Sequence, residues 1–119
     1  MDNIIFYADA KGNSQVYDII KKLAKSRGKE NRIRLKKIQE YIDILDIHGV
    51  GIGEPYIKHL DGEIWELRPM HDRIVFAGAI NGKYVLLHQF MKKTQKTPKR
   101  EIEKAKRELA DFKERSGLK

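Results

Sequence analysis

Two tight-turn dipeptides in the second half of the chain restrict its fold more than any other feature. Asn81-Gly82 is typical of a two-residue hairpin turn, and Asp61-Gly62 has the same chemistry, because glycine adopts the positive φ angles that such turns need. Runs rich in β-forming residues flank the two dipeptides, at 56–60, 64–70, 73–80 and 83–90. The sequence therefore predicts hairpins that join into an antiparallel sheet.

The first half of the chain has helical periodicity instead. A turn that offers Asn13 or Ser14 as a helix cap precedes apolar residues that recur every three or four positions up to Gly28. A second helix is expected over residues 30–48. Its predicted buried stripe consists of Leu35, Ile38, Ile42 and Leu45. The glycines and the proline of residues 49–55 end this helix.

A short strand over residues 4–8 and a helix that begins at Thr97-Pro98 complete the predicted fold. Proline suits the first position of a helix, where its missing N–H is not needed. The apolar stripe of this last helix is Ile102, Ala105, Leu109 and Phe112. We write the predicted order as β-α-α-β-β-β-α, an α+β fold in which two helices pack on the sheet, with one domain over residues 1–119.

The positive charge of the chain is concentrated in two blocks. The 119 residues contain 25 Lys and Arg against 17 Asp and Glu, a formal net charge of +8. Residues 21–37 hold nine bases and one acid, residues 92–119 hold eleven bases and five acids, and residues 38–67 between them hold one base and seven acids. Such blocks favour a polyanionic partner or an acidic protein partner, and solvated helix faces are the alternative for each block.

The residue types that the chain lacks exclude several classes of protein. There is no cysteine, so a disulfide scaffold and zinc sites built on thiolates are excluded. No apolar run approaches the about 20 residues that span a bilayer, and the acidic start Met1-Asp2-Asn3 is unlike a signal peptide. The four histidines lack the spacing of a zinc-binding motif. We expect a small, soluble, cytoplasmic protein without a metal, another cofactor or a membrane partner.

Two other features are interpreted as structural. The glycine-rich segment 49–53 resembles a phosphate-binding loop, but it follows a helix and leads to a strand, so no helix N-terminus would point at the anion. Trp65 is interpreted as a core residue of the sheet rather than as a platform for stacking bases.

Basic and imidazole side chains are spread over the predicted strands in a way that suits phosphodiester chemistry. The candidates for catalysis are Lys58, His59, Arg68, Arg73 and His88. Antiparallel strands bring such positions to one face or edge of a sheet, where fixed positive charge can stabilise a developing phosphorane beside a general acid and base. The candidates for RNA binding are Tyr56, Phe90, Lys92, Lys93 and Lys96. From these residues alone a ribonuclease, a nucleic-acid-binding module and a protein-binding module all remain open.

Two segments carry a resemblance to a known family. The stretch PYIKHLDGEIWELRP at 55–69 and the stretch LLHQFMKKTQKTP at 86–98, with Arg-Ile-Val-Phe at 73–76 between them, resemble the RelE/HigB toxins, and the closest branch is the HigB-like, phage-derived one. The resemblance implies an antiparallel sheet with two helices and a C-terminal helix. It also implies a ribosome-dependent endoribonuclease that cuts mRNA by attack of the RNA 2′-hydroxyl.

The family pattern implies roles for particular residues. It assigns charge stabilisation in the transition state to Arg68 and a second phosphate clamp to Arg73. Lys58 matches the basic position before the Asp-Gly turn, and Lys92 and Lys93 match the basic pair after the last strand. For Lys92 and Lys93, docking on ribosomal RNA without chemistry is an alternative.

Other roles stay open at this point. An ion pair with Glu66 or Asp72 is the structural alternative for Arg68. His88 and His59 are acid–base candidates, but some family members place a tyrosine near the C-terminus and this chain has none after residue 84. The resemblance therefore leaves the general base unassigned.

The resemblance also implies partners. A toxin of this type is neutralised by a HigA-like helix-turn-helix antitoxin in a hetero-oligomeric complex, which binds operator DNA mainly through the antitoxin, and the toxin acts on the ribosome and its mRNA. Two other functions remain as alternatives: a ParE-like inhibitor of DNA gyrase without ribonuclease activity, and a non-catalytic nucleic-acid-binding module.

Overall fold

Both predicted hairpins are present in the computed structural model, which describes residues 2–117. The strands are β1 (Ile4–Phe6), β2 (Ile57–Asp61), β3 (Ile64–Leu67), β4 (Asp72–Ile80) and β5 (Lys83–Met91). The helices are α1 (Gln15–Lys25), α2 (Lys29–His48) and α3 (Lys99–Arg115), with a short 3₁₀ turn, η1 (Gly49–Ile52), after α2. The five strands form one sheet in the order β1-β5-β4-β3-β2, and the fold is α+β as predicted.

The strand order differs from the prediction in two ways. The predicted order has three strands between the second and the last helix, whereas each of the four β-rich runs forms a strand of its own. The sheet is also mixed rather than antiparallel, because β1 pairs in parallel with β5, so that Ile4 lies opposite Tyr84. The two helices carry the chain from β1 to β2 at the opposite edge of the sheet. Three antiparallel reversals then bring β5 back beside β1, and they leave β5 running in the same direction as β1.

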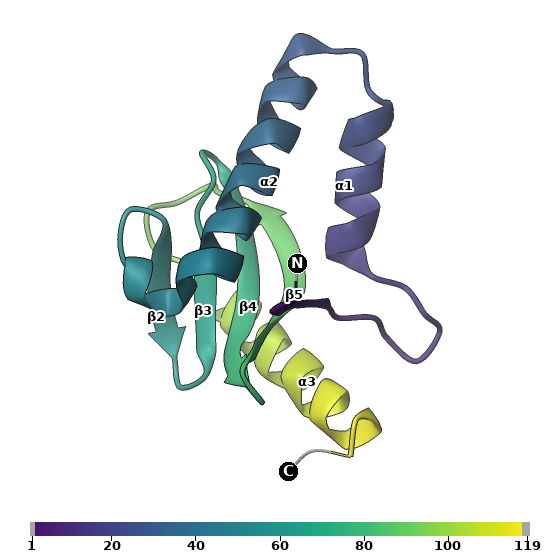
Figure 1. Cartoon of the computed structure of the whole chain (residues 1–119), viewed down its shortest axis with the longest axis vertical. Helices are drawn as coiled ribbons and strands as arrows, with labels where there is room; N and C mark the ends of the chain where they lie inside the picture. The colour runs from purple at the N-terminus through teal and green to yellow at the C-terminus, as the bar shows by residue number, and fades with distance from the viewer. Residues whose placement is uncertain (1, 118–119) are drawn as a thin grey trace.

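Helices cover both faces of the sheet (Figure 1). The face under α1 and α2 carries a core cluster that includes Ile74 and Phe76 of β4, while Val75 and Ala77, which alternate with them, belong to the cluster under α3. This alternation is the normal consequence of strand geometry, in which successive side chains point to opposite faces. The predicted stripes of α2 and α3 are those that face the sheet.

A bulge in β5 changes which side chains face α3. Val75 pairs with His88, but Phe76 pairs with Leu86, so Leu87 is an extra residue in β5. An extra residue shifts the two-residue alternation by one position. Leu87 and His88 therefore both lie on the α3 side, and Phe90 follows on that side two residues later.

The turns and caps follow the predicted chemistry closely. Asn81 and Gly82 have φ angles of 52° and 79°, as a two-residue hairpin turn with two positive φ angles needs. Ser14 caps α1, because its side chain accepts a hydrogen bond from the N–H of Tyr17. Pro98 stands at the cap of α3, one residue before the predicted position.

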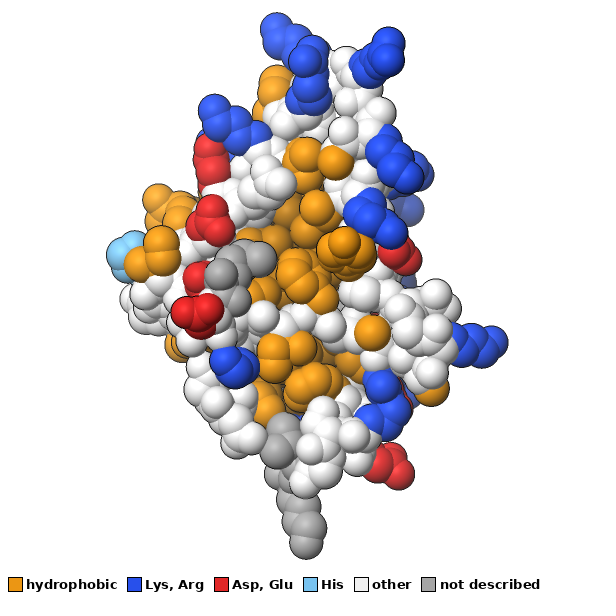
Figure 2. Space-filling view, turned by 45° about the vertical axis from the view of Figure 1, so that its right-hand side comes forward, with side chains coloured by type: hydrophobic (Ala, Val, Ile, Leu, Met, Phe, Trp, Pro, Cys, Tyr) orange, Lys and Arg blue, Asp and Glu red, His pale blue; other side chains and the backbone are white. Residues whose placement is uncertain are grey.

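The α1–α2 hairpin carries the first basic block to one end of the molecule. Lys and Arg side chains gather around the tip of this hairpin (Figure 2), which contains most of residues 21–37. Apolar side chains lie between the two helices on the same face of the molecule (Figure 2). Within residues 2–117, the structure contains no helix that combines the length and the apolar character required to cross a membrane.

Candidate active site

The loop between β3 and β4 brings two arginines together at one end of the sheet. Arg68 follows β3 directly, and its backbone N–H donates to the carbonyl of Tyr56 at 2.9 Å. Arg73 is the second residue of β4 and is only 6% exposed. Its Nη1 donates to the carbonyls of Met70 and Asp72 at 2.7 and 2.9 Å. Burial lowers the pKa of Arg73, and the nearby positive charge of Arg68 lowers this pKa further.

A buried carboxylate lies beside these arginines. Glu66 is 2% exposed and faces the α3 side of the sheet, since it alternates with the core residue Leu67. Its Oε2 is 3.6 Å from Nε of Arg68, which is beyond hydrogen-bonding distance. That Nε is buried and has no hydrogen-bond partner among the described residues. We call Glu66, Arg68 and Arg73 the arginine cluster.

An ion pair with Glu66 or Asp72 was the structural alternative for Arg68, and the structure contains the pair with Glu66 at a long distance. Glu66 is one partner, and the exposed Glu54 is the other, with Oε1 3.5 Å from Nη1. The buried Asp72 pairs with Arg34 of α2 instead. A guanidinium with long contacts and one unsatisfied nitrogen is available to bind an added anion.

The segment 92–98 between β5 and α3 folds over the arginine cluster. It encloses a cavity of about 10 Å³ with Glu66, Arg73 and Phe90, which is room for about one water molecule. The hydroxyl of Thr97 donates to Oε1 of Glu66 at 2.7 Å. Lys92, whose N–H donates to the carbonyl of His71, begins the segment. We call residues 92–98 the lysine loop.

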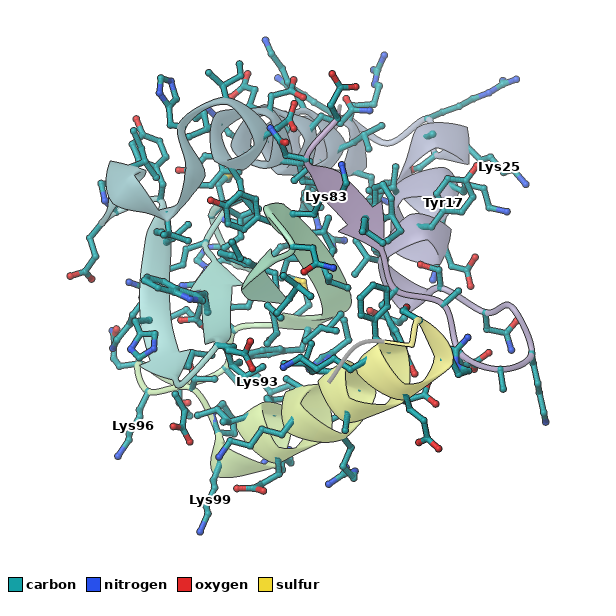
Figure 3. All side chains as sticks on the ribbon, turned by 60° about the horizontal axis from the view of Figure 1, so that its bottom comes forward. Tyr17, Lys25, Lys83, Lys93, Lys96 and Lys99 are labelled. Atoms are coloured by element: carbon teal, nitrogen blue, oxygen red, sulfur yellow. The ribbon has the colours of Figure 1, made fainter. Side chains whose placement is uncertain are left out.

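The three lysines of the lysine loop differ in exposure. Lys92 is half-buried, and its Nζ donates to Oε1 of Gln95 at 3.5 Å. Lys93 and Lys96 are exposed, and Lys96 points away from the protein, as does Lys99 of α3 (Figure 3). The segment that carries the predicted RNA-binding lysines therefore lies over Glu66 and Arg73.

His88 lies on the same face but is enclosed by α3. It is fully buried, its Nδ1 is 2.5 Å from Oε1 of Glu108, and its Nε2 is 3.0 Å from Oε1 of Glu101. We call these three residues the histidine cluster. Because both ring nitrogens are occupied and His88 does not line the cavity, the structure does not bring this acid–base candidate to the arginines.

The two predicted residues of β2 separate onto opposite faces of the sheet. Lys58 is exposed and lies opposite Glu66 in the β2–β3 ladder, which puts it next to the arginine cluster. His59 lies opposite Trp65 instead, with the ring centroids 4.6 Å apart and Nε2 2.7 Å from the carbonyl oxygen of Gly62. Lys58 is therefore placed to contact a ligand of the arginines, and His59 is not.

The aromatic candidates separate in the same way. Phe90 lies opposite Arg73 in the β4–β5 ladder and lines the cavity. Tyr56 packs on Tyr41 of α2, with ring centroids 5.3 Å apart, on the other face of the sheet. Trp65 is half-buried and packs against the core on that face, as predicted.

Sequence reasoning did not identify Glu66 and Thr97 as site residues. The alternation of β3 places Glu66 and Arg68 on one side, and a carboxylate in an otherwise apolar strand is a signal of function. The carboxylates around His88 could also have been recognised, because Glu101 and Glu108 are seven residues apart and therefore lie on the same face of one helix. Within residues 2–117, no group of three or more His, Asp or Glu side chains is arranged to hold a metal ion.

The geometry of the arginine cluster defines what it can do. Two guanidinium groups can bind the oxygens of one phosphate, since each offers several donors in a planar fork. The buried carboxylate already accepts a hydrogen bond from a hydroxyl, that of Thr97, and could accept one from a ligand hydroxyl in its place.

Comparison with known families identifies one match. Residues 20–110 match the family described as phage-derived protein Gp49-like (DUF891). A comparison with curated proteins finds no match. The matched residues span α2, all four strands of the two hairpins and most of α3, so the family region contains the whole arginine cluster. The chain therefore belongs to the Gp49-like family of phage-derived proteins, which is known as a family of toxin–antitoxin toxins.

Proposed function

We propose that this protein is the toxin of a type II toxin–antitoxin pair and cleaves translated mRNA as a metal-independent, ribosome-dependent endoribonuclease of the HigB/RelE type. The observation that carries the proposal is the arginine cluster beneath the lysine loop. Cleavage of RNA through its own 2′-hydroxyl needs fixed positive charge on the phosphate and a group that accepts a proton.

The residues of the cluster have distinct roles in the proposed reaction. The RNA 2′-oxygen forms a bond to phosphorus, and the bond from phosphorus to the 5′-oxygen breaks. Arg68 and Arg73 stabilise the charge of the pentacoordinate phosphorane. Glu66 accepts the proton of the 2′-hydroxyl, and Lys92 or Lys93 returns a proton to the 5′-oxygen. The products end in a cyclic phosphate and a 5′-hydroxyl.

The closed lysine loop supports a requirement for the ribosome. A cavity of about 10 Å³ does not admit a phosphodiester, so the loop must move before RNA can reach Arg73. Docking of the two basic blocks on a large RNA surface supplies both the contacts that displace the loop and the orientation of the message. Orientation of this kind can lower a reaction barrier by roughly 7–11 kcal/mol.

Cleavage of one message, free and on translating ribosomes, tests this proposal. We expect little cleavage of the free message, cleavage on ribosomes, and a steep loss of activity as the salt concentration rises, because many cations contact phosphate. Equal rates on free and ribosome-bound message would show that the basic blocks serve another purpose.

A ParE-like inhibitor of DNA gyrase, without ribonuclease activity, remains the second candidate. The observation in its favour is the same closed loop, since an inhibitor has no need of an open cavity. Expression without a partner separates the two functions. The proposed nuclease stops protein synthesis first, whereas a gyrase inhibitor blocks DNA replication while protein synthesis continues.

The proposed partners follow from the proposed activity. A HigA-like helix-turn-helix antitoxin neutralises the toxin, and the complex binds operator DNA mainly through the antitoxin. A short neighbouring reading frame with a helix-turn-helix pattern would support this pairing.

A further inference from the structure

A groove between α2 and the ends of β4 and β5 gathers exposed apolar side chains. Ile33, Met70 and Met91 line it and are 43%, 49% and 42% exposed. They are three of the five large hydrophobic residues that are exposed within residues 2–117; the other two are Tyr17 and Ile47. The groove has a volume of about 370 Å³. Apolar side chains that gather in this way on a surface mark a binding site, whereas scattered ones do not.

The walls of the groove are held rigidly. Arg34 of α2 donates from Nε and Nη2 to the two carboxylate oxygens of Asp72, at 3.1 and 2.8 Å. Gln89 of β5 donates to the same carboxylate at 2.7 Å. Asp72 is 1% exposed, so this network ties α2 to β4 and β5 where water cannot compete. The groove is therefore formed before any partner arrives.

Met70 is held in a strained conformation that presents it to the groove. Its φ angle is 58°, which is uncommon for a residue other than glycine. Its carbonyl accepts a hydrogen bond from Nη1 of Arg73, and its side chain is half exposed. Strain of this kind is kept mainly at functional sites. The same peptide thus connects the groove to the arginine cluster.

The chemistry of the groove selects its occupant. Its apolar lining consists of one Ile and two Met, and it contains no Phe, Tyr or Trp; the imidazole of His71 is its one ring. Flexible thioethers fit the apolar side chains of a protein better than the flat face of a nucleobase. Lys29 and Glu30 of α2 both line the groove, where Arg34 is already paired with Asp72. The helix that forms this wall is basic as a whole, because Lys29, Arg32 and Lys36 are exposed and form no ion pair within the described part of the chain. Glu30 is the one acid among residues 21–37.

We propose that this groove binds an acidic amphipathic helix of a partner protein. Apolar side chains of the helix, spaced i, i+3, i+4 and i+7, pack on Ile33, Met70 and Met91, and its carboxylates face the basic residues of α2. This inference goes beyond the nuclease activity and does not depend on it. A helix in the groove lies next to the lysine loop, where it would hinder the approach of RNA to Arg73.

A synthetic helix is a direct probe of the groove. A fluorescent, helix-stabilised peptide of about 16 residues, with Leu at i, i+3, i+4 and i+7 and Glu elsewhere, is titrated with the full-length protein and followed by anisotropy. Ile33→Glu and Met91→Glu each place a charge in the groove and are expected to weaken binding at least about 10-fold, the value of one buried apolar side chain. Both positions are more than 40% exposed, so both variants are expected to fold.

Two control variants locate the effect. Ile47→Glu makes the same substitution at the other end of α2, where the side chain is 73% exposed, and is expected to leave peptide binding unchanged. Tyr17→Glu places a charge in a different apolar groove, between α1 and α2, which Phe6 and Ile20 also line. This variant is also expected to leave peptide binding unchanged. A peptide with Lys in place of Glu is expected not to bind.

Several results would overturn the proposal. No binding of the acidic peptide, equal binding by all variants, or a loss of binding confined to Tyr17→Glu would each do so. A fluorescent RNA oligonucleotide that loses affinity with Ile33→Glu and Met91→Glu, while the peptide does not, would make the groove an RNA subsite. Ribosomal cleavage is measured separately, so failure of the nuclease and failure of the groove are distinguishable.

Discussion

The arginine cluster and the histidine cluster are both buried on the α3 face of the sheet, yet they differ in how well they are satisfied. Each ring nitrogen of His88 has its own carboxylate, and both carboxylates come from the helix that covers them. The arginine cluster has two cations for one buried carboxylate, and Nε of Arg68 has no hydrogen-bond partner in the described structure.

The covers of the two clusters differ as well. A helix of 17 residues, fixed by the buried Ala105 and Leu109, closes the histidine cluster. The arginine cluster is closed by the lysine loop, whose contact with Glu66 is a hydrogen bond from Thr97. A fully satisfied network under a packed helix stabilises the fold, whereas excess charge under a loop is suited to binding an anion. The comparison thus favours a structural role for the histidine cluster, and it is the reason why we place the proposed chemistry in the arginine cluster.

The largest expected effect is on stability, at the histidine cluster. His88→Ala leaves Glu101 and Glu108 without their shared partner, and loss of one member of such a buried polar network typically costs about 3–5 kcal/mol. Urea unfolding measures this loss, with His71→Ala, at an exposed side chain, as the control. If His88→Ala keeps the full free energy of unfolding but abolishes mRNA cleavage, the histidine belongs to the chemistry.

The next effect is on activity, at the arginine cluster. Glu66→Gln keeps the shape of the side chain and the contact with Thr97 but removes the group that accepts the proton. We expect ribosomal cleavage to fall at least about 10²-fold, the usual contribution of general base catalysis. The matched control is Glu103→Gln on α3, a carboxylate outside the cavity. Full activity of a folded Glu66→Gln would leave the cluster without its proposed base.

A smaller effect on cleavage is expected from a change in the lysine loop. Thr97→Val removes the hydrogen bond from the lysine loop to Glu66, which is worth roughly 0.5–1.5 kcal/mol. In the proposed mechanism the closed loop excludes RNA from Arg73, so we expect cleavage to be maintained or to rise by a few fold. Cleavage in a translating extract measures this change. A fall of about 10²-fold would instead place the Thr97 hydroxyl in the reaction.

The smallest expected effect is on the stability that Tyr7 contributes through its hydrogen bond to Asp111 of α3. Burial and the 2.6 Å hydrogen bond to Asp111 raise the pKa of Tyr7 to about 12 from its ordinary value of 10.0. Between these two values the unfolded chain loses the phenol proton and the folded protein keeps it, so this contribution to stability is complete below pH 10 and declines as the pH rises toward 12. Tyr7→Phe is expected to cost about 1 kcal/mol at neutral pH and to lose this alkaline decline.

Stability measured at several pH values checks this prediction. The difference in free energy of unfolding between the wild-type protein and Tyr7→Phe should shrink as the pH rises from 10 to 12. A constant difference over that range would show that the phenol does not titrate differently in the folded and unfolded states.

Local chemistry explains which parts of the fold could be predicted from the sequence. Asn81-Gly82 sets its own hairpin, Ser14 caps its own helix, and the alternation along β3 puts Glu66 and Arg68 on one face. The proximity of Arg68 and Arg73 also follows, because a short turn joins their strands. Each of these features depends on residues close together in the sequence.

The features that could not be predicted depend on distant residues. The parallel pairing of β1 with β5 joins residues about 80 positions apart and leaves no local pattern. The bulge at Leu87 changes the alternation of β5, so His88 faces α3 although the simple two-residue pattern would not place it beside Leu87. The position of the lysine loop over Glu66 depends on how α3 docks, which its apolar stripe alone does not determine.

Cleavage of translated mRNA by variants of Arg68 tests the central claim most directly. Arg68→Ala is expected to fold and to lose at least about 10²-fold in the rate of ribosomal cleavage, because it removes one transition-state contact. Arg68→Lys is expected to restore only part of the rate, because an ammonium does not reproduce the two-pronged guanidinium. Arg107→Ala, at an exposed position of α3, is the control and should cleave normally. A folded Arg68→Ala that cuts translated mRNA at the wild-type rate would contradict the assignment of chemistry to the arginine cluster.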